Sequence, residues 1–511
     1  FGLEKMSMPL LSVEDLSVHF GPTHAPLPAV SQASFTVDPG EIVGVVGESG
    51  SGKSTMCTAI MRSLPPAARV SGRVDFNGQS LLTLSTSQMR ALRGKDLAMV
   101  LQNPMTSLDP LFSIGDQSLE VLRLHGAKPG ATEQDAVDLL RKVRITAPEV
   151  RVRQYPHQMS GGMKQRILTA FATASSPKLL IADEPTTALD ATVQEEILSL
   201  FWDIRQRSKM AILLVTHDLG VVQRISDRTV VMYAGRIVES GPTAQVFGEP
   251  RHPYTRGLIG SMPRVVAGRV ELQSIPGQVP RLDQMGQGCA FAPRCPKASS
   301  QCANNPVASS VGTGHQVACW HPHSLDRAAR AEHSQTDDLT LQRLKPATDQ
   351  SNTPKGQEFA IEAQGLLKRY RLSRQSLLRP PPVVQAVDDV SFRVRRGTTF
   401  GLVGESGSGK TTVAKMLLKL EQPTGGILKV EGENVFSQDA AAERSYRSLV
   451  QAVLQDPYGA LSPRLRAGHI VAEPLVAKMG GAWDQALVRA ADLMELVGLR
   501  REDVQKFPHE F

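Results

Sequence analysis

The chain has 511 residues, of which 41% are hydrophobic and 21% are charged, enough for several domains that each bury a core. It contains no run of about 18 apolar residues and no N-terminal basic, apolar and small-residue pattern, so we predict neither a spanning helix nor a signal peptide. The net charge of +7 is spread along the chain and only 5% of residues are aromatic, which argues against a nucleic-acid stacking surface. We therefore expect a cytosolic protein without a nucleic-acid partner.

Short apolar runs alternate with helical stretches in the first half of the chain. IVGVVG at 42–47, LLIADEP at 179–185 and AILLVTHD at 211–218 are each followed by turn or helix-start residues, which is typical of buried strands. Strands that alternate with helices predict a parallel α/β sheet. Between residues 105 and 155 the pattern becomes amphipathic, as in TEQDAVDLLRKV, and predicts a mainly helical insert.

One Gly-rich segment occurs twice, as GESGSGKST at 47–55 and as GESGSGKTT at 404–412. Both match the P-loop, whose backbone N–H groups and following helix N-terminus bind phosphates. We expect Lys53 and Lys410 to reach the terminal phosphates, and the Ser54 and Thr411 hydroxyls to help ligate Mg²⁺. The residues predicted to bind nucleotide are Gly47, Glu48, Ser49, Gly50, Ser51, Gly52, Lys53, Ser54 and Thr55, and Gly404, Glu405, Ser406, Gly407, Ser408, Gly409, Lys410, Thr411 and Thr412.

Two adjacent carboxylates end the run LLIADEP. Because successive side chains of a strand point to opposite faces, we expect them to do different work. Asp183 suits a Mg²⁺ ligand and Glu184 a base that polarises the attacking water. His217 follows AILLVT at the end of another predicted strand, where parallel sheets bind ligands, although a lone histidine there is more often structural.

With SGGMKQR at 160–166, these motifs make the chain resemble the ATP-binding subunits of ABC transporters over nearly its whole length. The resemblance implies tandem P-loop NTPase domains, each a RecA-like parallel-sheet core with a helical subdomain. It also implies ATP and Mg²⁺ as cofactors. The residue roles that it implies are the signature motif at Ser160, Gly161 and Gly162, the Mg²⁺-binding Q-loop glutamines Gln102 and Gln455, the D-loop residue Asp190, the switch residue His217, and the adenine-stacking rings Phe20 and Tyr370.

In that family two ATPase domains close head to tail, so that each ATP lies between one P-loop and the signature motif of the other domain. The segment QYPHQM precedes Ser160, and the similar segment KFPHEF ends the chain at Phe511. By this register the second domain stops one residue before its own signature. We therefore expect an intramolecular dimer of domains only in a longer protein, and weak nucleotide binding and slow hydrolysis by this chain.

Four of the five cysteines fall between residues 289 and 319, as Cys289, Cys295, Cys302 and Cys319. In a cytosolic chain such clustering favours a metal or cluster site over disulfides. The absence of CxxC pairs weakens zinc, and four thiolates suit an iron–sulfur cluster; zinc and merely reduced thiols stay as alternatives. The remaining Cys57 is expected to be a small packing residue.

RHPYTRGL at 251–258, GCAFAPRCP at 288–296 and VACW at 317–320 resemble the C-terminal extension of oligopeptide and dipeptide importer ATPases, some of which hold a [4Fe–4S] cluster on these cysteines. Fusion of two ATPases resembles bacterial glutathione and related peptide importers. The resemblance implies two membrane permease subunits and a substrate-binding protein as partners, and a peripheral position on the cytoplasmic face of the inner membrane. The alternatives are a non-transport ABC ATPase of ribosomes or DNA, and an inactive truncated fragment.

The predicted organisation has four parts. They are a first ATPase domain at 8–250, a cysteine-containing extension at 251–323, a linker at 324–357 and an incomplete second ATPase domain at 358–511.

Overall fold

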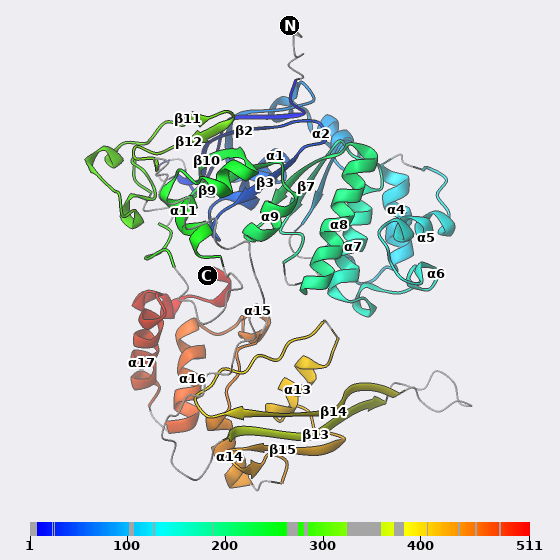
Figure 1. The fold of residues 1–511 in the computed structure, drawn as a ribbon, viewed down its shortest axis with the longest axis vertical. Helices are drawn as coiled ribbons and strands as arrows, with labels where there is room; N and C mark the ends of the chain where they lie inside the picture. Colours follow the sequence, from blue (N-terminus) through cyan, green and yellow to red (C-terminus); the bar gives the residue numbers. More distant parts are fainter. Residues whose placement is uncertain are drawn as a thin grey trace, which may run out of the picture. The chain divides into compact units, whose positions relative to one another are not determined.

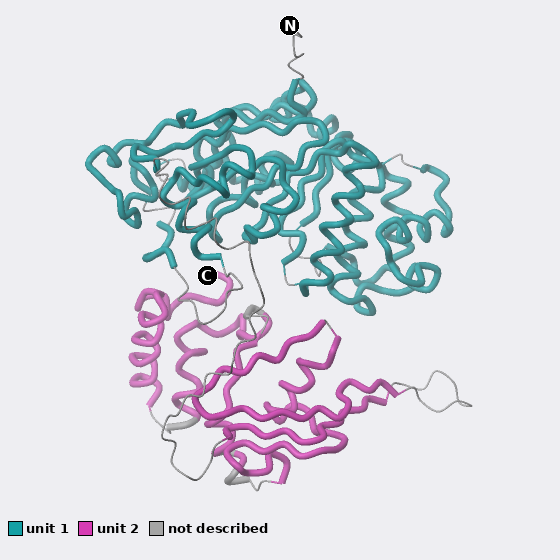
Figure 2. The backbone as a smooth tube through the Cα atoms, in the orientation of Figure 1, with its two compact units in different colours: residues 1–346 teal, residues 347–511 magenta. Residues whose placement is uncertain are grey.

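The computed structural model describes residues 8–22, 24, 26–101, 107–125, 128–187, 189–262, 274–280, 285–323, 359–371, 383–405, 407–437, 440–454, 457–479 and 482–511. The chain divides into two units, residues 1–346 and residues 347–511 (Figure 2). The linker predicted at 324–357 lies outside the described residues. None of the helices in the described segments has the length and apolar character needed to cross a bilayer.

An antiparallel sheet opens the first unit (Figure 1). Its strand order is β2-β1-β4-β5. The strands are β1 (Leu11–Phe20), β2 (Leu27–Val37), β4 (Arg69–Phe76) and β5 (Gln79–Ser80). Leu11, Val13, Leu16 and Val18 of β1 are fully or almost fully buried and belong to the core beneath the sheet. The sequence analysis did not predict this sheet.

A second sheet of eight strands carries the predicted strands. Its order is β11-β12-β10-β9-β3-β8-β7-β6. The strands are β3 (Ile42–Val46), β6 (Leu97–Val100), β7 (Leu179–Asp183), β8 (Ala211–Val215), β9 (Arg228–Tyr233), β10 (Arg236–Pro242), β11 (Ser309–Gly312) and β12 (His315–Val317). Every residue of β3, β7 and β8 is buried, as expected for parallel strands covered on both faces.

The predicted parallel core is present, and the sheet that contains it also has antiparallel strands, which the sequence did not predict. Strands β9, β3, β8, β7 and β6 pair in parallel, whereas β10 pairs with β9 in the antiparallel sense. Only Ala234 and Gly235 separate β9 from β10, and both have positive φ, of 46° and 79°. Such two-residue turns join antiparallel strands, so the chain reverses direction here and the sheet continues with antiparallel strands.

Helices cover the sheet and build a separate lobe. Those packed near the sheet are α1 (Lys53–Ile60), α2 (Thr86–Leu92), α7 (Gly161–Thr173), α8 (Ala191–Ser208) and α9 (Leu219–Ile225). The predicted helical insert is present as α4 (Ile114–Leu124), α5 (Glu133–Lys142) and α6 (Pro148–Arg151). Its apolar side chains form their own core with residues of α7 and α8, which links this lobe to the sheet (Figure 1).

The extension at 251–323 continues the main sheet. Strand β12 pairs with β10, and β11 pairs with β12. The extension also contains α11 (Pro253–Gly260) and the short 3₁₀ turns η4 (Ala292–Arg294) and η5 (Ser300–Ala303), and α10 (Thr243–Gly248) precedes it. Tyr254 and Phe291 share one apolar core with Tyr233 of β9. The extension is therefore packed against the sheet that carries the first P-loop.

The second unit has an antiparallel sheet of the same order as the first, β14-β13-β15-β16. Its strands are β13 (Phe359–Arg371), β14 (Val383–Arg395), β15 (Gly425–Val430) and β16 (Glu433–Asn434). Its helices are α13 (Lys410–Leu417), α14 (Ala440–Leu449), α15 (Pro457–Ala460), α16 (Ala467–Met479) and α17 (Trp483–Leu496), followed by the 3₁₀ turns η6 (Arg501–Gln505) and η7 (Pro508–Glu510). Residues 398–405 before its P-loop form no strand, and Val403 is 88% exposed.

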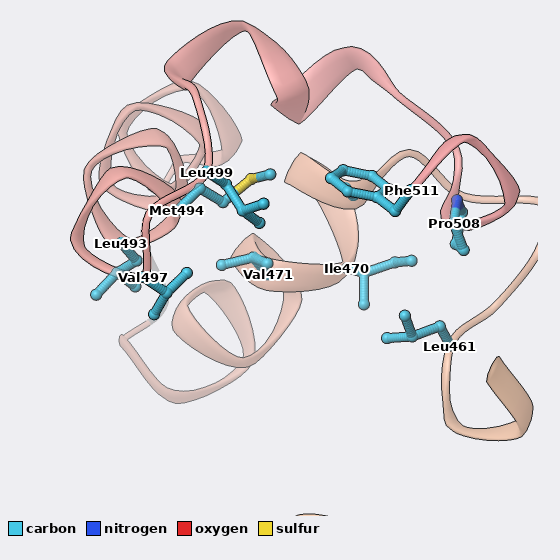
Figure 3. Close-up of a pocket in the computed structure, with 10 residues that line it drawn as sticks. Leu461, Ile470, Val471, Leu493, Met494, Val497, Leu499, Pro508 and Phe511 are labelled. Carbon is cyan, nitrogen blue, oxygen red and sulfur yellow. The ribbon is translucent and has the colours of Figure 1, made fainter. Parts of the chain in front are cut away.

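An apolar pocket of about 320 Å³ lies between α16, α17 and the end of the chain (Figure 3). Ile470 and Val471 of α16 line it from one side and Met494 of α17 from another, and Phe511 lies beside them. This pocket belongs to the helical lobe of the second unit.

Both helical lobes depend on a glycine at the start of a helix. A Cβ atom at Gly115 of α4 would lie 2.7 Å from the Val152 carbonyl oxygen, and one at Gly468 of α16 would lie 2.9 Å from the Val504 carbonyl oxygen. The neighbouring N–H groups donate to the same segments, from Gly115 to Val152 at 2.7 Å and from Ala467 to Lys506 at 2.8 Å. The helix and the segment that crosses it therefore approach too closely for a side chain.

We expect Gly115→Ala and Gly468→Ala each to destabilise their own lobe by about 1–3 kcal/mol, because backbone must move to admit the new methyl group. Hydrogen exchange of α4 and α16, measured separately, checks this. Gly130→Ala is the matched control, since nothing lies within 4 Å of a Cβ atom there. Exchange that is as slow in the two variants as in the control would contradict the packing argument.

Candidate functional site

The first P-loop connects the buried strand β3 to α1. A Cβ atom at Gly47 would lie 2.1 Å from the Met232 carbonyl oxygen, so only glycine allows the loop to pass β9 here. The Lys53 ammonium donates to the Gly47 and Glu48 carbonyl oxygens at 2.8 and 2.9 Å and to the Ser51 hydroxyl at 3.2 Å. Burial lowers the pKa of Lys53. The Lys53 side chain therefore lies folded back across the P-loop, whose bound phosphates it is predicted to contact.

The hairpin turn between β9 and β10 supports this loop from outside. The Gly235 N–H donates to the Ser51 carbonyl oxygen at 3.0 Å, and the Gly235 carbonyl oxygen accepts from the Ser31 N–H at 2.8 Å. These bonds link the P-loop both to the main sheet and to the antiparallel sheet.

The second P-loop has the same internal bonds. The Lys410 ammonium donates to the Gly404 and Glu405 carbonyl oxygens, both at 2.6 Å, and to the Ser408 hydroxyl at 3.4 Å. Ser406 lies outside the described residues. The lysine contacts of the first loop are thus repeated here, although residues 398–403 form no strand.

The other predicted loop residues lie in the two loops or in the first turn of the helix that follows. Gly52 and Gly409 are the N-caps of α1 and α13, with φ of 93° and 91°. The remaining members are Ser49, Gly50, Ser54 and Thr55 in the first unit and Gly407, Thr411 and Thr412 in the second.

Asp183, at the end of β7, lies beside the first P-loop. The Ser54 hydroxyl donates to its carboxylate at 3.1 Å. Burial raises the pKa of Asp183, so a cation placed here would offset the cost of keeping this carboxylate charged. The structure thus brings together two of the three predicted Mg²⁺ ligands of the first site, and the third, Gln102, lies outside the described residues. An oxygen pair of this kind fits Mg²⁺, which commonly retains water and phosphate oxygens as its other ligands.

Glu184, the next residue, points to a different set of groups. One carboxylate oxygen lies 3.3 Å from His217 Nδ1, and the other accepts from the Thr187 hydroxyl at 2.9 Å. Glu184 has φ of 49°, a backbone conformation that non-glycine residues rarely adopt and that often marks functional sites. Sequence reasoning missed Thr187, whose only signal was its place one turn after the acidic pair.

Ser160 and Asp190 both cap helices in the first unit. The Ser160 hydroxyl accepts from the Met163 N–H at 3.3 Å at the start of α7, and the Asp190 carboxylate accepts from the Val193 N–H at 2.9 Å at the start of α8. Gly161 begins α7. A Cβ atom at Gly162 would meet Val193 at 2.4 Å, so this glycine lets α7 and α8 approach closely.

The remaining predicted residues have no contacts that test their roles. Gln102 and Gln455 lie outside the described residues. Phe20 ends β1 and packs against the core of the first unit. Tyr370 lies in β13, where the Lys368 ammonium is 4.9 Å from the centre of its ring. Adenine stacking by these two rings stays a prediction.

Two residues of the extension contact the first P-loop, and sequence reasoning missed both. The Arg294 guanidinium pairs with the Glu48 carboxylate at 2.7 Å, and the Tyr254 hydroxyl accepts from the Glu48 N–H at 2.9 Å. The only available signals were the RHPY and APRC segments in which they occur.

The four clustered cysteines gather in the extension. The Cys289 N–H donates to the Cys302 carbonyl oxygen at 2.9 Å. Burial, and to a smaller extent the three neighbouring thiols, raises the pKa of Cys319 to about 11. Thiols are suitable donors for an iron–sulfur cluster, yet the described part of the chain contains no group of three or more His, Cys, Asp or Glu side chains arranged to hold a metal ion. The arrangement therefore gives the predicted cluster no support.

Two family models match the chain. One, described as ABC transporter, matches residues 30–187 and 387–511, and one described as the C-terminal region of oligopeptide/dipeptide transporters matches residues 238–302.

Three curated relatives show how far the similarity extends. The oligopeptide transport ATP-binding protein OppD of Mycobacterium tuberculosis is 41% identical over 509 residues, which cover 98% of this chain and 81% of the relative. The dipeptide transport ATP-binding protein DppD of Escherichia coli is 45% identical over 326 residues, 63% of this chain and 99% of the relative. The glutathione import ATP-binding protein GsiA of Salmonella paratyphi A is 36% identical over 517 residues, 99% of this chain and 73% of the relative.

We expect Glu184→Gln to lower the rate of ATP hydrolysis by about 100-fold or more and to change ATP affinity little, because an amide cannot accept a proton from the attacking water. Phosphate release and binding of a fluorescent ATP analogue provide the two measurements. Glu195→Gln is the control, since Glu195 pairs with Arg224 on the exposed side of α8. An unchanged hydrolysis rate in Glu184→Gln would remove the assigned role.

Proposed function

Since this chain belongs to the ABC transporter family of ATPases, we propose that it binds and hydrolyses ATP to power a bacterial importer of peptides. The observation that carries the proposal is the combination of an ABC transporter match on both P-loop regions with an oligopeptide/dipeptide transporter match on the extension. Relatives that cover nearly the whole chain carry the names of oligopeptide and glutathione import subunits. These names support peptides as the class of cargo. The permease and the binding protein would select the individual cargo.

The first site supports a division of work among its side chains. When nucleotide binds, the Lys53 ammonium would leave the carbonyl oxygens of its own loop and donate to phosphate oxygens instead. Phosphate oxygens are negatively charged, so they attract the ammonium more strongly than neutral carbonyl oxygens do. Ser54 and Asp183, joined at 3.1 Å, are the residues that would hold Mg²⁺, which when bound offsets the charge of the phosphates.

Glu184 would orient the attacking water and accept its proton. His217 and Thr187 each contact a different oxygen of this carboxylate, so together they can fix its orientation. A fixed base lowers the reorganisation that the reaction requires.

We further propose tandem ATPase domains, with the two sheets of matching strand order as support. The composite sites would form when one domain meets the signature motif of another. Two membrane permease subunits and a substrate-binding protein complete the transporter, and this chain would occupy the cytoplasmic face of the membrane without spanning it. The helical lobes and the glutamine loops are the proposed contact to the permeases.

The surface beside α4 offers an apolar contact of the kind a permease needs. Leu111 is 80% exposed and Phe112 is 54% exposed. These two residues are neighbours in the sequence and lie just before α4, the first helix of the lobe. Exposed apolar side chains that adjoin each other are typical of a binding surface, whereas single ones are ordinary.

We expect the double variant Leu111→Ser with Phe112→Ser to bind the co-expressed permeases more weakly, because the apolar contact is lost, while ATP binding is kept. Co-purification with detergent-solubilised permeases measures this. Val307→Ser is the matched control, because Val307 is 81% exposed but lies in the extension. Permease binding that survives the double variant, or co-purification of the parent chain with ribosomes instead, would contradict this contact.

We propose further that the extension holds a [4Fe–4S] cluster on Cys289, Cys295, Cys302 and Cys319. This proposal rests on the similarity of the region to importer extensions and not on ligand geometry, since the described residues bring no three of these side chains together around a metal site. We expect protein purified without oxygen to contain about four iron atoms per chain and to absorb visible light. Cys57→Ser, in the buried first turns of α1, is the control that should keep the iron. Colourless, iron-free protein after reconstitution would end the proposal, and zinc in its place would select the alternative.

A further inference from the structure

Arg294 of the extension forms a two-bond ion pair with the first P-loop. Its Nη1 lies 2.7 Å from Glu48 Oε2, and its Nη2 lies 3.1 Å from Glu48 Oε1. The Arg294 side chain is only 6% exposed and that of Glu48 26%. Two parallel charge-assisted bonds fix direction as well as distance, and partial burial makes them stronger than a surface pair.

The Arg294 side chain is held in place by further hydrogen bonds. The guanidinium also donates to the Ile275 and Pro276 carbonyl oxygens at 3.1 and 2.8 Å and to the Tyr233 hydroxyl at 3.3 Å. Its five N–H donors are therefore used mostly on fixed protein atoms, and the side chain has little freedom to turn away from Glu48.

Tyr254, from the RHPY segment, holds the backbone of the same residue. Its hydroxyl accepts from the Glu48 N–H at 2.9 Å, and the tyrosine is fully buried. Its ring packs against Tyr233 and Phe291, with ring centres 4.6 and 5.4 Å apart. A side chain from α11 and one from η4 thus converge on one P-loop residue.

Glu48 is also a partner of the phosphate-binding lysine. Its carbonyl oxygen accepts from the Lys53 ammonium at 2.9 Å. Glu48 therefore bonds through its carboxylate, its N–H and its carbonyl oxygen to Arg294, Tyr254 and Lys53, respectively. A shift of the Glu48 carboxylate would therefore also shift the Glu48 carbonyl group, to which the Lys53 ammonium donates.

We propose that Arg294 is a positioning residue for nucleotide binding, which acts through Glu48 to hold the first P-loop in its phosphate-binding form. The extension thereby sets the ATP affinity of this loop. A loop that is ordered beforehand loses less conformational entropy when the nucleotide binds, so affinity is higher. The inference rests on ATP binding at the first P-loop, which belongs to the proposed function.

The test measures binding of a methylanthraniloyl-ATP probe to the full chain, in a Lys410→Ala background that weakens the second P-loop. We expect Arg294→Ala to weaken binding about tenfold, or about 1.4 kcal/mol, and Arg294→Lys to recover part of the loss, because lysine supplies one charge-assisted bond in place of two. Glu48→Gln should weaken binding to a similar degree. Adding Arg294→Ala to Glu48→Gln should cost little more, since the two residues act through one contact.

Glu195→Gln is the matched control, because it likewise removes a carboxylate that pairs with an arginine, Arg224, but lies outside both P-loops. It should leave probe binding in this background unchanged. Melting temperatures without nucleotide identify a variant that is merely misfolded; if Arg294→Ala unfolds, the Arg294→Lys and Glu48→Gln pair carries the same comparison.

Equal affinities in the parent, Arg294→Lys and Glu48→Gln chains would overturn the inference, as would a loss from Arg294→Ala that is just as large in the Glu48→Gln background. Failure of the proposed function looks different, because the parent chain itself would then not bind the probe. That result would overturn both.

Discussion

The pairing of β3 between β8 and β9 is the constraint on which the first site depends. All three strands are parallel, and β3 ends at Val46, immediately before Gly47, where the P-loop begins. Its two neighbours lead to the other parts of the site: β8 to His217, and β9 to the hairpin turn that supports the loop. Because these strands are parallel, their carboxyl ends lie at one edge of the sheet, so groups from distant parts of the sequence meet there.

The chemistry of the site follows from where the acidic strand β7 ends. Asp183 is still part of the strand and lies against Ser54, whereas Glu184 has left it with positive φ and reaches His217. The end of β7 therefore holds one carboxylate suited to binding a cation, Asp183, and another suited to accepting a proton, Glu184. The ABC transporter family model matches the region that carries both carboxylates. The peptide importer match falls on the extension, whose Arg294 forms an ion pair with Glu48 of the first P-loop.

Sequence reasoning predicted the elements that a local residue pattern determines. It missed the features that depend on strand pairing or on contacts between residues far apart in the sequence. The apolar runs at β3, β7 and β8 predicted their strands because burial on both faces leaves an uninterrupted apolar signature. Strand β1 escaped notice, because register shifts and the positive φ of Asp15 break its alternation. The contact between Arg294 and Glu48 could not be predicted, since 246 residues separate the two and neither type is distinctive. The cysteine cluster was visible in sequence, but spacing alone does not give ligand geometry.

The two P-loops differ in the structure that precedes them. In the first unit the sheet holds the loop before any ligand arrives, whereas residues 398–405 of the second form no strand and Val403 is exposed. Lys410 nonetheless keeps the loop closed through its own carbonyl bonds. The same lysine contacts therefore form in both units, so this part of the loop conformation follows from the loop's own sequence and needs no strand immediately before it.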